Sequence, residues 1–241
     1  MEERKMIYLC LAHMSETGEE QKYVKEAFDT NWVVPLGPNV NGFETDLKYY
    51  VSDPDDGTDL QKEVVALSAG TAAVHLALLA CGVGPGDEVC VQSFTFCASS
   101  HPITYLGATP VFIDSERDTW NMDPELLEKA IIDRKEKTGK YPKAIVPVAL
   151  YGMPYDCERI MTIANKYGIP VVEDAAEGFG SRYKGRVLGT FGKFGVLSFN
   201  GNKMITTSGG GALICENMED KNQVMWYATQ ARDSYPYYQH T

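Results

Sequence analysis

The sequence predicts an α/β protein built as a three-layer sandwich, with helices covering both faces of a mostly parallel central sheet. Short apolar runs alternate with segments of helical periodicity between residues 64 and 173, which is the pattern of consecutive βαβ units. Turn-forming glycine, proline and polar residues separate these runs. The 241 residues are 44% hydrophobic and 23% charged, a balance that excludes a disordered or fibrous chain.

The expected elements follow one another in a regular order. Apolar residues have helical spacing at residues 23–28 and again at 40–50, with a turn between them at 35–38 and a polar loop afterwards at 52–59. The pattern then predicts strands at residues 64–67, 87–92, 110–113, 144–150 and 170–173, alternating with helices at 70–79, 98–106, 124–132 and 157–167. After Asp174, glycine-rich loops flank strands expected at 195–199 and 211–215, and a final helix is expected at 218–229.

The charge and the polar residues exclude several classes of protein. A net charge of -11 argues against nucleic-acid binding, which needs a basic surface. The sequence has no run of about 18 apolar residues, so we expect no membrane span, and its first five residues are mixed in charge, unlike a signal peptide. Six cysteines and four histidines lie far apart without disulfide or zinc spacing. We therefore expect a cytoplasmic protein with reduced thiols and no metal site.

The first candidate site element is the segment Ser68-Ala69-Gly70-Thr71-Ala72, between an expected strand and an expected helix. Glycine lets the backbone approach a ligand, and the unpaired N–H groups of a helix start favour a phosphate. The competing interpretation is a simple N-cap, because Ser and Thr often cap helices without binding a ligand. Neither G-x-G-x-x-G after the first strand nor G-x-x-x-x-G-K-[ST] is present, so the common nucleotide motifs do not compete.

The second candidate element is an apolar strand that ends in carboxylates, Val171-Val172-Glu173-Asp174-Ala175-Ala176-Glu177. Ligands of open parallel sheets lie at the carboxyl ends of strands, where Asp174 and Glu177 are expected. A carboxylate at Asp174 could keep a pyridinium nitrogen protonated, and Glu177 could reach the same ligand from the next turn. The competing interpretation is that both are first-turn acids, which the helix dipole favours.

The third candidate element is Lys203, which follows a strand and the tight turn Asn200-Gly201-Asn202 and precedes the glycine triplet at residues 209–211. A lysine that forms a Schiff base must lose its proton, and a packed, partly apolar position disfavours the charged form. A lysine on a loop is more commonly solvated, and that remains the competing interpretation.

Together these segments resemble the DegT/DnrJ/StrS family of pyridoxal phosphate (PLP)-dependent sugar aminotransferases, which have the aspartate-aminotransferase fold (fold type I). The matching segments also include Gly84-Pro85-Gly86-Asp87-Glu88-Val89, Thr95-Phe96, Leu106-Gly107-Ala108-Thr109-Pro110, Leu150-Tyr151-Gly152 and Ser198-Phe199. Lys203 stands five positions after Ser198, as in that family. The resemblance runs from about Gly37 to Lys203 and continues more weakly to the end of the chain.

The resemblance implies a role for each of seven residues. Gly70, Thr71 and Ser198 would hold the phosphate of PLP. Phe96 would stack on the pyridine ring, although an aromatic at a strand end is often only part of the core. Asp174 would pair with the ring nitrogen, and Glu177, where the family often has Gln or His, would lie beside the ring hydroxyl or nearby. Lys203 would form the Schiff base and then act as general base and acid.

The resemblance also implies the activity and the organisation of the protein. The expected reaction moves an amino group from glutamate to a keto group of a nucleotide-linked deoxysugar, and the expected assembly is a homodimer. The closest subgroup in motif pattern is the bacterial enzymes that make UDP-linked 4-amino sugars. We expect an N-terminal segment at residues 1–35 and a PLP-binding large domain at 36–241. The small C-terminal domain of the family is absent, so we expect a fragment or a truncated product.

Three other functions remain open from the sequence. A sugar dehydratase of the same family would have histidine at the position of Lys203, so this lysine argues against that reaction. Another fold type I enzyme, such as a desulfurase, would need a catalytic cysteine in a flexible loop. A non-catalytic fragment that binds PLP or only a partner would keep the fold without the reaction.

Overall fold

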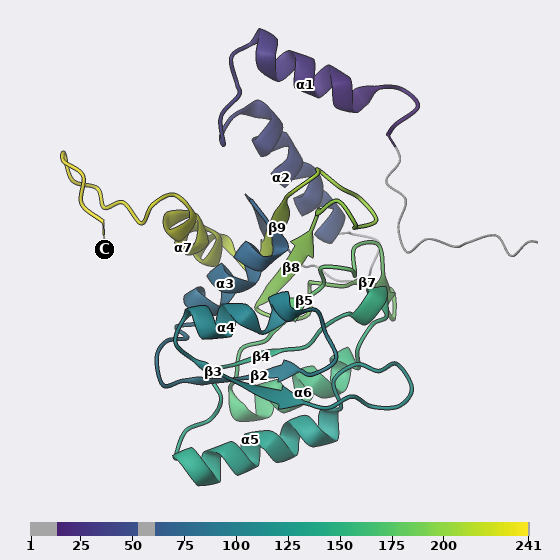
Figure 1. The fold of residues 1–241 in the computed structure, drawn as a ribbon, viewed down its shortest axis with the longest axis vertical. Coiled ribbons are helices and arrows are strands. Elements are labelled where there is room, and N and C mark those ends of the chain that lie inside the picture. The colour runs from purple at the N-terminus through teal and green to yellow at the C-terminus, as the bar shows by residue number, and fades with distance from the viewer. Residues whose placement is uncertain (1–13, 53–60, 241) are drawn as a thin grey trace, which may run out of the picture.

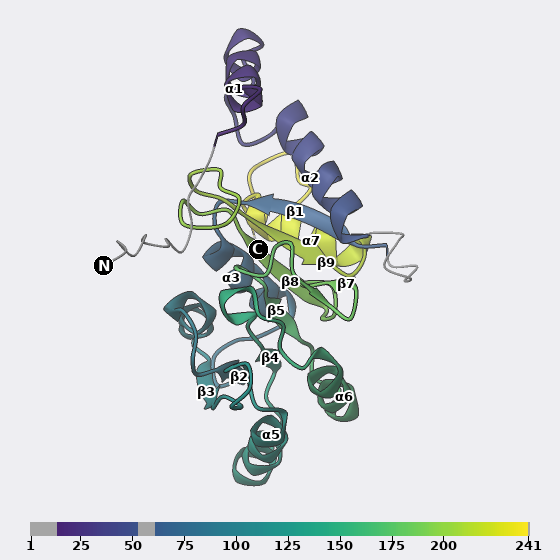
Figure 2. The same cartoon turned by 90° about the vertical axis from the view of Figure 1, so that its right-hand side faces the viewer.

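The computed structural model describes residues 14–52 and 61–240, and its centre is an open sheet with helices on both faces (Figures 1 and 2). The strands of this sheet are β1 (Glu63–Leu67), β2 (Glu88–Gln92), β3 (Thr109–Ile113), β4 (Ala144–Val146), β5 (Val172–Asp174), β8 (Phe194–Ser198) and β9 (Gly211–Cys215). A short hairpin, β6 (Arg182–Tyr183) and β7 (Arg186–Val187), lies outside the sheet.

The spatial order of the sheet is β1-β9-β8-β5-β4-β2-β3. Parallel bridges between Ile145 and Val171 and between Val148 and Asp174 join the two groups of strands. β9 is antiparallel to both of its neighbours, and the other neighbouring pairs are parallel. The predicted mostly parallel sheet is therefore confirmed. Because parallel strands share one carboxyl edge, the loops that follow β1, β2, β4, β5 and β8 meet there.

Helices pack on the two faces of the sheet and close two separate cores. The helices are α1 (Glu19–Asp29), α2 (Pro38–Val51), α3 (Gly70–Ala80), α4 (His101–Tyr105), α5 (Pro124–Thr138), α6 (Cys157–Tyr167) and α7 (Met218–Ala228), with 3-10 turns η2 (Cys97–Ser99) and η3 (Leu150–Gly152). One core contains residues of α2, α5 and α6, and the other contains residues of α3, α4 and α7. Helices on both faces make the three predicted layers.

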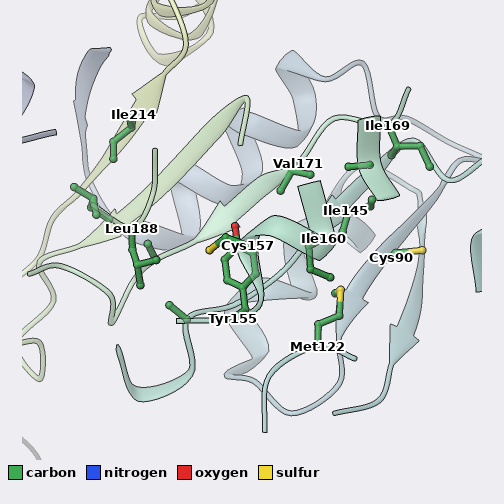
Figure 3. Packing of buried hydrophobic residues seen from close by; sticks show 14 of the residues in the cluster. Cys90, Met122, Ile145, Tyr155, Cys157, Ile160, Ile169, Val171, Leu188 and Ile214 are labelled. Carbon is green, nitrogen blue, oxygen red and sulfur yellow. The ribbon is translucent and has the colours of Figure 1, made fainter. Parts of the chain in front are cut away.

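Alternation of side chains along the strands supplies both cores at once. In β9, Ile214 points into the core beneath α5 and α6, whereas Leu213 and Cys215 point into the core beneath α3 and α7. Figure 3 shows the first core, where Ile214 lies in one group with Ile145 of β4 and Ile160 of α6. Such strands are apolar on both faces, which is why they appear in the sequence as continuous apolar runs.

Three elements differ from the prediction because of proline and glycine. The expected helix at 98–106 is divided into η2 and α4, since Pro102 has no N–H for an α-helical bond to residue 98. The expected strand at 144–150 leaves the regular ladder after Val146, where Pro147 again lacks an N–H. α5 continues beyond 132 to Thr138 and ends at Gly139, whose φ of 76° is left-handed.

The N-terminal helices differ in how far they join the body. α2 buries Leu47 and Val51 beside β1, whereas α1 buries no residue and stands at one end of the molecule in Figures 1 and 2. Across the described ranges, the helices are too short or too polar to cross a bilayer.

The placement of α5 predicts a difference between two adjacent isoleucines. Ile131 is fully buried, whereas Ile132 is 43% exposed. We expect Ile131→Val to lower the free energy of unfolding by about 0.5–1.5 kcal/mol, because it removes a methylene from a packed core. Ile132→Val, the control, is expected to change it by less than about 0.5 kcal/mol. Urea unfolding measures both, and equal costs would contradict this orientation of α5.

Candidate functional site

A pocket of about 540 Å³ opens at the carboxyl edge of the sheet, where parallel strands place their loops. Its volume lies within the range of about 300–1,000 Å³ that is typical of small-molecule sites. The seven residues predicted for the site all line it: Gly70, Thr71, Phe96, Asp174, Glu177, Ser198 and Lys203. The fold thus brings together residues that lie up to 133 positions apart in the sequence.

Asp174 is the last residue of β5 and therefore lies at the carboxyl edge of the sheet. Only 6% of its surface is exposed. Its Oδ2 accepts a hydrogen bond from Ser99 Oγ at 2.5 Å, and its Oδ1 accepts one from the Ala176 amide at 3.2 Å. Burial raises the pKa of Asp174, while the bond from Ser99, the bond from Ala176 and the charge of Lys203 lower it. Asp174 is therefore a pocket carboxylate held in place by two donors.

Lys203 approaches the pocket from the loop after β8, and 15% of its side chain is exposed. Its Nζ lies 3.2 Å from Glu177 Oε1. The other oxygen of Glu177, Oε2, accepts a hydrogen bond from the Tyr151 amide at 3.0 Å. The backbone of Lys203 is fixed as well, because its amide donates to the Asn200 carbonyl at 2.9 Å. The predicted tight turn thus presents a largely enclosed amine to the pocket.

The start of α3 forms the part of the pocket that suits an anion. The N-cap residue of α3 is Ala69, which makes no side-chain capping bond, so Ser68 and Thr71 do not act as simple caps. A Cβ at Gly70 would lie 3.0 Å from Ser198 Cβ, closer than side chains normally pack, so glycine allows this approach of helix and strand. The helix N–H groups and the hydroxyls of Ser68, Thr71 and Ser198 surround the same space.

Phe96 is not a core residue. It follows β2, is 75% exposed and lines the pocket. The competing interpretation of a buried aromatic is therefore wrong for this side chain. An aromatic face at the mouth of a pocket can stack on a planar ring.

Three residues near the site were not predicted to have a role in it. Ser99 and Thr95 form a hydroxyl pair behind Asp174, with their oxygens 2.7 Å apart. Glu173 is buried on the opposite face of β5 and accepts hydrogen bonds from the amides of Gly189, Phe191 and Gly192. Those bonds tie the 189–192 loop to the strand that carries Asp174. The sequence gave no signal for these roles, because buried polar groups need partners and the partners of Ser99 and Glu173 are distant in the chain.

Comparison with known proteins identifies the family. The model of the DegT/DnrJ/EryC1/StrS aminotransferase family matches residues 14–240. A Bacillus subtilis (strain 168) protein, named as the pyridoxal phosphate-dependent aminotransferase EpsN, is 49% identical over 98% of this chain and 58% of its own length. GDP-perosamine synthase of Escherichia coli O157:H7 is 41% identical over 87% of this chain and 53% of its own length. The chain belongs to the DegT/DnrJ/EryC1/StrS aminotransferase family.

A solved structure supports the same assignment. The crystal structure of a DegT/DnrJ/EryC1/StrS aminotransferase from Brucella abortus superposes with a TM-score of 0.80 at 30% identity, covering 95% of this chain and 62% of that one. The predicted family and the predicted fold are both confirmed. The chain spans little more than half the length of these two curated relatives.

Proposed function

We propose that this protein is a PLP-dependent aminotransferase that moves an amino group from glutamate to a keto group of a nucleotide-linked deoxysugar. The observation that supports it most is that Lys203 and the buried Asp174 line one pocket together with the uncapped start of α3. The named activities of the relatives, a PLP-dependent aminotransferase and a GDP-perosamine synthase, support the reaction and the substrate class.

The residues of the pocket fit the proposed cofactor. The phosphate would lie against the α3 N–H groups with Thr71 and Ser198, which Gly70 allows to lie close to the start of the helix. Phe96 would cover the ring, and the carboxylate of Asp174 would pair with its nitrogen. When bound, PLP supplies an electron sink for carbanion chemistry.

Different residues of the pocket would bind the cofactor, orient its partner amine and transfer the proton. Lys203 would be the group that holds the aldehyde of the cofactor, and its amine would serve as base and acid toward the substrate proton. Glu177 contacts that amine at 3.2 Å and the Tyr151 amide at 3.0 Å, so it orients Lys203 relative to the η3 turn. The negative charge of Asp174 would keep the ring nitrogen protonated, as the electron sink requires.

We further propose a cytoplasmic homodimer with residues 36–241 as its PLP-binding domain and residues 1–35 as a separate N-terminal segment. The free thiols of Cys81, Cys90, Cys97, Cys157 and Cys215 agree with a reducing compartment. The absence of buried residues in α1 agrees with a segment apart from the large domain. Cys10 lies outside the described residues.

Transfer of labelled nitrogen tests the proposed reaction. The purified protein is incubated with PLP, ¹⁵N-glutamate and a nucleotide-linked 4-keto deoxysugar, and the sugar is analysed by mass spectrometry. We expect ¹⁵N in the sugar and none with the Lys203→Ala variant. Loss of a sugar hydroxyl without nitrogen gain would indicate the dehydratase instead. A protein that binds PLP but changes neither reactant would be the non-catalytic alternative, and the proposal would be wrong.

A further inference from the structure

Two hydroxyl groups form a chain that ends on the pocket carboxylate. Thr95 Oγ1 and Ser99 Oγ lie 2.7 Å apart, and Ser99 Oγ lies 2.5 Å from Asp174 Oδ2. Ser99 is 1% exposed, so water does not compete for these bonds. Both hydroxyls come from the loop and 3-10 turn after β2, whereas Asp174 ends β5. The chain of hydrogen bonds therefore crosses from one strand end to another along the pocket lining.

The number of protons decides the direction of the chain. A serine hydroxyl has one proton, and an ionised carboxylate only accepts hydrogen bonds. If Asp174 is ionised, Ser99 must donate to it, and Thr95 must then donate to Ser99. If Asp174 takes a proton on Oδ2, it donates that proton to Ser99 Oγ, and the Ser99 proton must then turn to Thr95 or to another acceptor. The arrangement Thr95→Ser99→Asp174 is thus matched to the ionised form of the carboxylate, and each bond strengthens the next.

We propose that Ser99, supported by Thr95, is a positioning residue that keeps Asp174 negatively charged and aimed at the ring nitrogen of the cofactor. This inference rests on the proposed function, because it needs a ring nitrogen in the pocket. The hydroxyls of Thr95 and Ser99 do not contact the reacting atoms and act only through Asp174. The other charged groups that act on Asp174 are Lys203 and Glu177, which line the same pocket.

The neighbouring serine provides a matched control. Ser100 lies next to Ser99 in the sequence, but its hydroxyl donates only to the Cys97 carbonyl of its own turn, at 3.2 Å. Ser99→Ala and Ser100→Ala therefore remove the same group from adjacent positions, and only the first removes a donor to Asp174. Thr95→Val removes the second hydroxyl at almost constant shape, and Thr95→Ser restores it.

The ring nitrogen of bound PLP reports the effect directly. Each variant is loaded with PLP labelled with ¹⁵N in the ring, and the NMR shift of that nitrogen is followed from pH 6 to pH 9. We expect Ser99→Ala to lower the ratio of protonated to unprotonated ring nitrogen by about tenfold or more, since a hydrogen bond to a charged group is lost. Thr95→Val should have a smaller effect in the same direction, and Ser100→Ala and Thr95→Ser should match the wild type.

The possible results separate this inference from the proposed function. If the wild type does not bind PLP, the proposed function fails and the inference falls with it. If the wild type binds PLP but Ser99→Ala has the same ring-nitrogen shift at every pH, only the inference is overturned. Should Ser99→Ala fail to fold, Thr95→Val decides: an unchanged shift contradicts the inference, and lowered protonation that Thr95→Ser restores supports it.

Discussion

Replacing Lys203 with alanine is expected to lower nitrogen transfer from glutamate by at least about 10²–10⁴-fold, the contribution of one positioned acid–base group. The loss should be larger still, because in the proposed function the same amine also forms the covalent link to the cofactor. Lys203 lines the pocket, and its amine contacts the carboxylate of Glu177. Steady-state and single-turnover rates with ¹⁵N-glutamate measure the effect.

Lys166→Ala is a suitable control for this variant. Lys166 is exposed on α6, pairs with Glu128 at 2.7 Å and is not one of the residues that line the pocket. Surface changes of this kind alter stability by less than about 0.5 kcal/mol, so the rate should not change. A Lys203→Ala protein that folds, binds PLP and keeps a wild-type rate would show that another group performs the chemistry.

Replacing Asp174 with asparagine is expected to lower the transfer rate by about 10²–10³-fold, the usual cost of removing one group that stabilises charge in a transition state. Asparagine keeps the shape of the side chain but cannot hold the ring-nitrogen proton by charge. Both hydrogen bonds can survive, because Ser99 can reverse and accept from the new amide. Asp46→Asn, at an exposed position on α2, is the matched control. An equal loss in both variants would contradict the role of Asp174.

The same substitution should stabilise the cofactor-free fold. Burial raises the pKa of Asp174 above its ordinary 3.8, so the folded chain binds this proton more tightly than the unfolded chain. The stability from this group is complete below the unfolded pKa and is lost as pH rises through the folded pKa. At pH 7 the charged carboxylate therefore costs stability, and Asp174→Asn should raise Tm. The gain should shrink below pH 3.8, and a lower Tm at pH 7 would contradict it.

The alternation of elements was predictable because the strands are buried on both faces. Residues such as Leu213, Ile214 and Cys215 all need burial, so the strand appears as an unbroken apolar run. The order of the strands was not predictable from this pattern. Nothing in the β9 sequence indicates that it inserts antiparallel between β1 and β8, because a strand buried on both faces has the same composition in either direction.

The site was predictable where a residue type is unusual at its position, and not where its role depends on distant partners. Lys203 after a tight turn and Asp174 after an apolar strand both suggested a ligand, and the pocket contains both. Ser99 gave no such signal, because a serine is ordinary in a turn and its partner Asp174 is 75 positions away. Phe96 was ambiguous in sequence, and only the exposure of its side chain separated a pocket residue from a core residue.

Peptide mapping of the protein after borohydride treatment in the presence of PLP shows which lysine reacts with the cofactor. Reduction makes the link between cofactor and amine permanent, and tandem mass spectrometry then locates it in the sequence. A single reduced adduct on Lys203, absent when Asp174 and Lys203 are both replaced, is the expected result. An adduct on a different lysine, or none on a protein that has bound PLP, would show that this pocket is not the site of the chemistry.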